Sequence, residues 1–204
     1  IINKVNFISG DGNHNKNTPP LLYLKIISMK GDFYMHGCPS ALFGNGPVSL
    51  SKGLSKLMDE HPPLRKEMDG LSSLYGEVKT NNNEQAFHSL VNAVTRFILN
   101  LEHHSRREED YLFRVMEKYI GKNGGPIAVM EMEHERAHSL IDEFLHNAKK
   151  EQTIEEMKRN ALLVEEAHYT LLNHFAKEEQ VLYPMAENLL SDEEKQTLYE
   201  NVSK

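Results

Sequence analysis

From about residue 48 onward, apolar residues recur in alternating steps of three and four positions along four stretches of the chain. These stretches cover residues 54–75, 87–115, 127–144 and 157–185. The spacing is the 3.6-residue period of an amphipathic helix, whose apolar face packs against a core. Each stretch is therefore predicted to form a helix.

The segments between the predicted helices are short and rich in turn-forming residues. Asparagine fills most of residues 80–83, glycine most of 121–125, and a polar segment covers 149–153. Pro126 stands directly after the second break, where proline suits the first position of a helix. Because short connections between long helices favour antiparallel neighbours, the sequence predicts an all-α fold, an up-down-up-down antiparallel four-helix bundle.

Residues 1–46 show no sustained helical or strand period and contain Gly, Asn and Pro clusters at 10–13 and 19–20. We predict a loosely structured N-terminal extension over 1–46 and the bundle over 47–204. The apolar run at 21–24 is far too short to span a bilayer, and no targeting signal is visible. We therefore expect no membrane association.

Composition narrows the class of protein. The 204 residues include 23 Lys and Arg against 30 Asp and Glu, a net charge of −7 with no basic patch, which disfavours nucleic acid as a partner. Cys38 is the single cysteine, a usage typical of a reducing compartment, so a cytoplasmic location is expected. Eleven histidines and no tryptophan direct attention to imidazole, the commonest metal ligand.

Histidine and glutamate interrupt the apolar stripe of every predicted helix. A buried carboxylate costs several kcal/mol unless it is paired or bound to metal. Residues i and i+4 lie on the same helix face about 6 Å apart along the axis, so each such pair points into one region. The ligand candidates are His61, His104, Glu108, His134, His138, His174 and Glu178. We predict that these five imidazoles and two carboxylates meet at one bundle centre.

The ligand pattern occurs twice in the chain. Segments beginning at His104 and His174 share a basic residue directly before Glu-Glu, then a Leu and an aromatic residue, 70 positions apart. The pairs Glu60-His61 and Glu133-His134 repeat at an offset of 73. A repeated ligand set is much harder to obtain by chance than a single pair. The domain thus resembles two copies of a helix pair, each carrying half a metal site.

The series His61, His104-x3-Glu108, His134-x3-His138, His174-x3-Glu178 resembles the hemerythrin-like, HHE cation-binding domain over roughly residues 48–190. The segments 130–135 and 174–184 carry most of this similarity. The resemblance implies a non-haem di-iron centre inside a four-helix bundle. It implies that both carboxylates bridge the two metals and that the five histidines are terminal ligands.

Two subgroups of that family share features with the sequence. Oxygen-carrying hemerythrins place the last carboxylate as Asp five residues after its His, where this chain has Glu179, whereas the branch associated with repair of iron centres uses Glu at the fourth position, as Glu178 here. That branch usually has a Cys-containing N-terminal domain and commonly lacks the fifth His. Here Cys38 is alone and His138 is present, so the sequence lies between the subgroups, and either glutamate could bridge.

Imidazole and carboxylate ligands without thiolate suit iron or manganese, with zinc as an alternative. Carboxylates naturally span two metals about 3.5–4 Å apart. Two Fe²⁺ and two carboxylates leave a charge of +2, which a bridging oxide or hydroxide would partly cancel. Seven protein ligands leave an open position, at which O₂, NO or peroxide could bind.

Three classes of function fit this ligand set, and the sequence leaves open whether the protein is an enzyme. We favour a di-iron protein that binds O₂ or NO, or senses iron or oxygen. The alternative is a stress-response role in iron–sulfur cluster repair or in removal of NO or peroxide. The third class is a non-catalytic bundle that binds a cation or docks a partner.

Less specific interpretations stand beside these assignments. His61 precedes Pro62, which disfavours helical geometry at that residue, and His138 could be a core histidine. A ferritin-like reading of the two Glu-x-x-His motifs at 131–134 and 165–168 is disfavoured because Glu131 and His168 fall away from the apolar stripes. The remaining histidines are expected at the surface. Four glutamates are expected in solvent or orienting imidazoles through the other ring N–H, namely Glu60, Glu109, Glu133 and Glu179.

Overall fold

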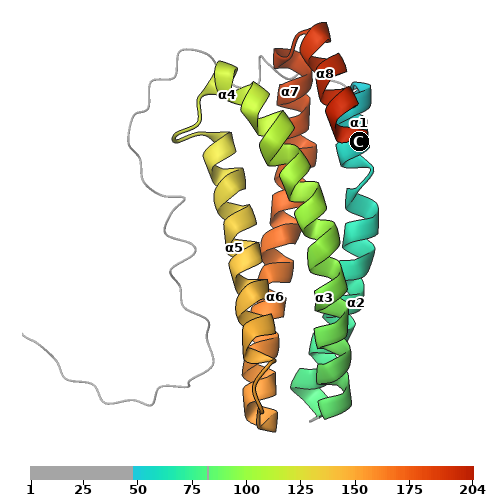
Figure 1. Ribbon diagram of the computed structural model, residues 1–204, viewed down its shortest axis with the longest axis vertical. Helices are drawn as coiled ribbons and strands as arrows, with labels where there is room; N and C mark the ends of the chain where they lie inside the picture. The colour runs from blue at the N-terminus through green and yellow to red at the C-terminus, as the bar shows by residue number, and fades with distance from the viewer. Residues whose placement is uncertain (1–47, 82) are drawn as a thin grey trace, which may run out of the picture. The chain divides into compact units, whose positions relative to one another are not determined.

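A computed structural model describes residues 48–81 and 83–204, and over these residues the chain is all-helical with no strand (Figure 1). The predicted extension, residues 1–46, lies outside the described residues. The helices are α1 (Lys52–Met58), α2 (His61–Asn81), α3 (Glu84–Arg107), α4 (Arg114–Ile120), α5 (Pro126–Asn147), α6 (Ile154–Lys177), α7 (Tyr183–Leu189) and α8 (Asp192–Val202). Two π-helical segments, η3 (Glu108–Phe113) and η4 (Glu178–Leu182), join α3 to α4 and α6 to α7.

The four long helices α2, α3, α5 and α6 lie side by side and form the body of a helical bundle (Figure 1). Helix α2 packs against α3 and α6, and α5 packs against α6 and α3. The shorter helices α1, α4, α7 and α8 gather at one end of the bundle, at the top in Figure 1. Within the described residues, no helix combines the length and apolarity needed to cross a membrane.

The predicted breaks between helices are confirmed by local chemistry at the helix ends. The Asn83 side chain accepts the Ala86 N–H at the start of α3, a capping contact. Gly121 ends α4 with a φ of +74°, a conformation that glycine adopts without steric cost. Thr153 and Glu156 form a capping box at the start of α6.

The structure differs from the prediction in the first of the four stretches and after the last one. The first stretch forms two helices, because α1 ends at Met58 and α2 begins at His61. Pro62 and Pro63 then occupy the first turn of α2, where the N–H that proline lacks has no partner within the helix. Helix α8 follows the predicted stretches, and the capping box of Ser191 with Glu194 is the local signal that marks it.

Buried apolar side chains form two separate clusters along the bundle. The bundle core joins α2, α3, α5 and α6 and includes Leu101 and Phe144. The cap core joins α1, α8, the start of α5 and the segments from η3 into α4 and from η4 into α7, and it includes Leu112 and Tyr183. Where α3 continues into η3, the predicted ligands of this segment lie between Leu101 of the bundle core and Leu112 of the cap core. The candidate site therefore occupies a polar layer between the two cores.

One histidine predicted at the surface is buried instead. His168 on α6 is 8% exposed, and its Nδ1 lies 2.8 Å from the hydroxyl of Tyr75 on α2. Burial lowers the pKa of His168, so its imidazole is neutral at pH 7 and can accept the tyrosine hydroxyl proton in a hydrogen bond. The neighbouring Glu165 pairs with Lys79 at the same contact between α2 and α6. Both partners of the second Glu-x-x-His motif thus have structural roles.

Candidate metal centre

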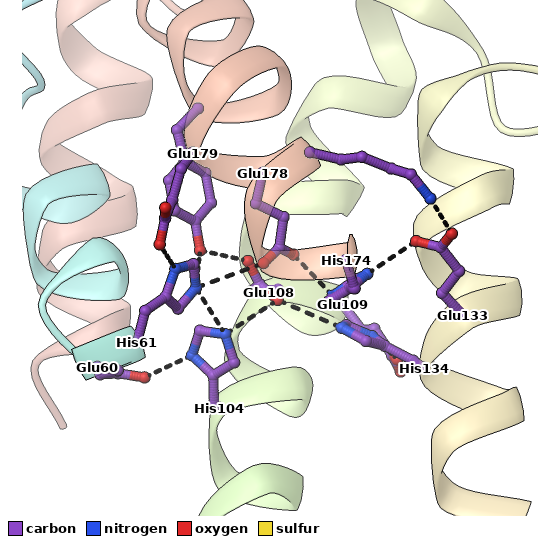
Figure 2. A network of polar contacts seen from close by, with 12 residues as sticks. Glu60, His61, His104, Glu108, Glu109, Glu133, His134, His174, Glu178 and Glu179 are labelled. Carbon is purple, nitrogen blue, oxygen red and sulfur yellow. Dashed lines mark hydrogen bonds and ion pairs between the residues drawn. The ribbon is translucent and has the colours of Figure 1, made fainter. Parts of the chain in front are cut away.

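Six of the seven predicted ligands meet between the bundle core and the cap core (Figure 2). They come from α2, α3, η3, α5, α6 and η4, and each is at most 2% exposed. Their ligand atoms form two groups, within each of which all atoms lie within 4.8 Å of one another. One group contains Glu108, His134, His174 and Glu178, and the other contains His61, His104 and Glu178. The two groups therefore share a carboxylate.

The shared carboxylate, Glu178, faces an imidazole with each of its oxygens. Its Oε1 lies 3.0 Å from Nε2 of His174, and its Oε2 lies 3.3 Å from Nε2 of His61. Glu179, the other candidate for a bridge, contacts the outer nitrogen Nδ1 of His61 at 2.7 Å. The central position is therefore occupied by Glu178, and Glu179 lies outside it.

Glu108 occupies the equivalent position on η3. Its Oε2 lies 3.4 Å from Nε2 of both His104 and His134. Its Oε1 accepts a 2.6 Å hydrogen bond from the hydroxyl of Tyr183. Both central glutamates are the first residues of π-helical segments, a local widening of the helix that is frequent at functional sites.

A second carboxylate contacts the outer nitrogen of each imidazole, as Figure 2 shows. The Nδ1 contacts are His61 with Glu179 at 2.7 Å, His104 with Glu60 at 2.8 Å, His134 with Glu109 at 2.7 Å and His174 with Glu133 at 3.2 Å. Because an ionised carboxylate can only accept, each Nδ1 donates its proton, and an imidazole that gives up its other ring proton presents the Nε2 lone pair to the centre. Of the two expectations for these glutamates, solvent or contact with the imidazoles, the structure shows the second.

Basic side chains hold three of these four outer carboxylates. Arg107 lies 2.6 Å from Glu60, Arg65 lies 2.5 Å from Glu179, and Lys177 pairs with Glu133. Arg107 also donates to the backbone carbonyl of Val202 at 2.7 Å, which ties α8 to this layer. In these three cases the imidazole contacts a carboxylate, and the carboxylate contacts a positively charged Arg or Lys side chain.

Strong electrostatic interactions act among the protein groups themselves. Burial lowers the pKa of His134, but the 3.4 Å contact with the Glu108 carboxylate and the hydrogen bond to Glu109 outweigh it and raise the pKa to about 10. Burial raises the pKa of Glu178, whereas its contacts with His174 and His61 hold that pKa well below the ordinary value. Without a bound cation, therefore, imidazolium neutralises the buried carboxylate at neutral pH.

Five buried atoms at the centre lack a hydrogen bond from any described residue. They are Oε2 of Glu108, Nε2 of His134, Nε2 of His174 and both carboxylate oxygens of Glu178. Buried polar atoms nearly always have a hydrogen-bond partner. A cation coordinated by these nitrogens and oxygens would satisfy them together. The donor set, without thiolate, fits iron, manganese or zinc.

The structure does not bring His138 into either group. It lies half-buried one turn after His134 on α5 and lines a cavity of about 350 Å³ between α3 and α5. Burial and the neighbouring His134 lower the pKa of the His138 imidazole. Its role as a metal ligand stays a prediction.

Tyr183 is a site residue that the sequence reasoning missed. Its hydroxyl donates to Glu108 and lies 3.2 Å from Nε2 of His61. Burial and the two central carboxylates raise its pKa well above the ordinary value, so it remains a neutral phenol. The signal that could have found it is the repeat, in which an aromatic residue follows the central glutamate by five positions. Phe113 fills that position in the first copy.

The match to a known family follows this geometry. The sequence model of the hemerythrin HHE cation-binding domain matches residues 52–186, which include all six clustered ligands. The chain therefore belongs to the hemerythrin HHE cation-binding domain family, whose members bind metal cations within a helical bundle. Comparison with curated proteins and with solved structures gives no match.

Proposed function

We propose that the protein binds two iron ions in this centre and, through them, binds O₂ or NO or senses iron or oxygen. The observation that carries the proposal is the pair of buried ligand groups sharing Glu178. A carboxylate shared between two groups of imidazoles can span two neighbouring metals. Iron would supply reversible redox chemistry and an open position for a diatomic ligand, and manganese and zinc are the alternative metals.

The contacts support a role for each residue. We assign one ion to the pair His61 and His104, the other to the pair His134 and His174, and both ions to Glu108 and Glu178. The outer carboxylates keep the ring Nδ1 protonated, so that each Nε2 remains a ligand. Tyr183 fixes one oxygen of Glu108 and leaves the other facing the centre. His138 is the proposed further ligand on the His134 side.

The proposal includes the up-down-up-down topology and a cytoplasmic location. Short connections after α2 and α5 support antiparallel neighbours. The single cysteine supports a reducing compartment.

A second candidate is repair of iron–sulfur clusters, or removal of NO or peroxide, in a stress response. The position of the central carboxylate favours it. Glu178, four residues after His174, faces the centre, while Glu179 contacts an outer ring nitrogen. This spacing resembles that of the family branch associated with repair of iron centres.

Metal analysis of the chain purified from iron-replete cells tests the proposal. We expect about two irons per chain, because the two ligand groups exceed what one metal can use. Optical spectra of the reduced protein with O₂ and with NO then distinguish the candidates. A spectral change on adding the gas supports reversible binding or sensing. No change with O₂, together with reactivation of a damaged iron–sulfur enzyme, supports repair, and a chain that holds no metal contradicts both.

A further inference from the structure

The internal repeat relates the two halves of the metal centre position by position. Each half has two histidines with their outer carboxylates, and the only further ligand proposed is His138 on the His134 side. Apart from His138, any difference between the halves comes from the residues packed around each half. We call them the His61 half, with His61 and His104, and the His134 half, with His134 and His174. The offsets of 73 and 70 identify the counterpart of each neighbouring residue.

The His61 half is closed by large side chains. The Phe175 ring stacks on the His61 imidazole with centroids 4.5 Å apart, and Phe175 is fully buried. The Arg65 guanidinium lies over the outer side of Phe175, 5.4 Å from its centroid, and pairs with Glu179. Tyr183 stacks against the same imidazole at 5.6 Å, but its counterpart Phe113 stacks on His134 at 5.8 Å, so the two halves differ at Phe175 and Arg65. Aromatic rings and an ion pair thus separate this half from solvent.

The His134 half has smaller groups at the two corresponding positions. Ser105 is the counterpart of Phe175, and His138 is the counterpart of Arg65. Both line the 350 Å³ cavity between α3 and α5. Ser105 is 3% exposed, yet its hydroxyl oxygen has no hydrogen bond from any described residue. The cavity therefore occupies the space that a phenyl ring fills on the other half.

The cavity extends from the surface to a metal ligand. The His134 imidazole forms part of its wall, and the Nε2 of this ring belongs to the metal centre. With a volume of about 350 Å³, the cavity has room for several water molecules and thus for a hydrated cation. Three other cavities within residues 48–81 and 83–204 have no clustered ligand in their walls.

The charge of the cavity suits a cation. Four glutamates line it, namely Glu102, Glu109, Glu131 and Glu135, against one arginine, Arg106. Arg106 pairs with Glu102, and Lys122 pairs with Glu131, which leaves the carboxylates of Glu109 and Glu135 without a Lys or Arg partner among the described residues. The side chain of Glu109 is 41% exposed while it holds Nδ1 of His134, so one carboxylate faces both the solvent and a ligand. An acidic cleft raises the local concentration of cations and their rate of association.

We infer that the cavity between α3 and α5 is the route by which divalent cations reach and leave the centre. The ion in the His134 half then exchanges faster than the ion in the His61 half, where Phe175 and Arg65 close the equivalent path. This inference rests on the proposed binding of two metal ions. It predicts two kinetically distinct ions within a nearly symmetric ligand set.

The test is release of metal from the fully loaded chain. The protein is loaded anaerobically with Fe²⁺, mixed with excess chelator, and followed by stopped-flow absorbance of the chelator complex. We expect two phases of equal amplitude in the wild type. Ser105→Phe, which places in the cavity the side chain present at the equivalent position, slows the fast phase at least tenfold with two ions still bound. Ser105→Ala, which keeps the cavity, releases metal as the wild type does.

If Ser105→Phe impairs folding, a variant that changes the charge of the cavity wall provides a second test. Glu135→Lys reverses one charge on the cavity wall and is expected to slow the fast phase of Fe²⁺ loading several-fold at low salt. Glu77→Lys makes the same change on the exposed face of α2 and should leave loading within twofold of the wild type. An unchanged fast phase in folded Ser105→Phe or in Glu135→Lys overturns the inference.

The outcomes separate the inference from the function on which it rests. A chain that binds two ions and releases both in one phase contradicts the inference alone. A chain that binds fewer than two ions contradicts the proposed function.

Discussion

Metal uptake by this centre should release protons, because His134 holds a proton at neutral pH. Its pKa is raised to about 10 by contacts with Glu108 and Glu109, whereas a coordinating Nε2 must be deprotonated. At pH 7.5, about 2.5 units below that pKa, only about 0.3% of His134 is neutral. Close to one proton per chain must therefore leave this residue on metal binding. The raised pKa values of His61 and His174 add to that number.

The magnitude and sign follow from the same pKa. Removing the His134 proton at pH 7.5 costs about 3 kcal/mol, at 1.36 kcal/mol per unit. The raised pKa means that the protonated form stabilises the fold without metal, fully below pH 6.5, and that this stabilisation is lost as the pH rises through about 10. Metal therefore competes with a proton. The apparent affinity for Fe²⁺ should rise about tenfold per pH unit between pH 7 and 9 from this residue alone.

Titration calorimetry under anaerobic conditions measures the proton release. Fe²⁺ is titrated at pH 7.5 in two buffers of different ionisation enthalpy, and the difference between the heats gives the number of protons released. We expect at least one proton per chain. Glu109→Gln removes one of the two contacts that raise the pKa of His134, so this variant should release fewer protons than the wild type at pH 8.5. Equal heats in the two buffers at pH 7.5 would refute the reasoning.

Three further predictions concern metal content and stability. The double variant His104→Ala, His174→Ala loses one imidazole from each half, so elemental analysis should show iron falling from about two ions per chain to less than one, and full retention would contradict the assignment. Chelation should lower the melting temperature by about 5–10 °C, since a ligand at 100 times its Kd stabilises by about 2.7 kcal/mol, and equal melting temperatures in calorimetry would argue against a buried site. Gly53→Ala brings a Cβ to 2.9 Å from the Tyr199 backbone nitrogen and should lower the free energy of unfolding in urea by about 1–3 kcal/mol. Gly70→Ala has open space and should raise it by roughly 0.5–1 kcal/mol, so equal effects of the two variants would contradict the packing of α1 on α8.

The long helices and six clustered residues could be predicted because both depend on one periodicity. A ligand that points into a bundle must interrupt an apolar stripe, so the pattern that predicts the helix also identifies the residue. His104 and Glu108 illustrate this, since their spacing of four brings them together within one turn. The four acidic neighbours were expected either in solvent or orienting the imidazoles, and their contacts decided between the two.

The same spacing could not place His138. Four residues along a helix advance the side chain by about 6 Å and turn it by about 40°, so the partner of His134 lies on the same face but at another level of the bundle. Whether that level is the centre or its edge depends on how α5 packs against α3. In the structure His138 lies at the edge, beside the cavity.

Tyr183 and the π-helical segments depend on three-dimensional context in a similar way. A π-helical turn is defined by its backbone hydrogen bonds and has no residue type that marks it in the sequence. Because η4 precedes Tyr183, the direction of this side chain could not be read from a regular helical period. Helix α8 was missed for a simpler reason, since it follows the last long apolar stripe and is marked only by its capping box at Ser191.

The polar layer between the bundle core and the cap core has a consequence for cooperativity. Two apolar clusters that meet across charged groups are coupled only weakly, so each can open as a separate folding unit. Cations bound by residues of α2, α5, α3 with η3, and α6 with η4 would link these units. Cation binding would then have little effect on the packing within either core. Its main effect would be that the two cores unfold together. With metal, hydrogen exchange should report one unit that opens as a whole, and after chelation the cap core should exchange first.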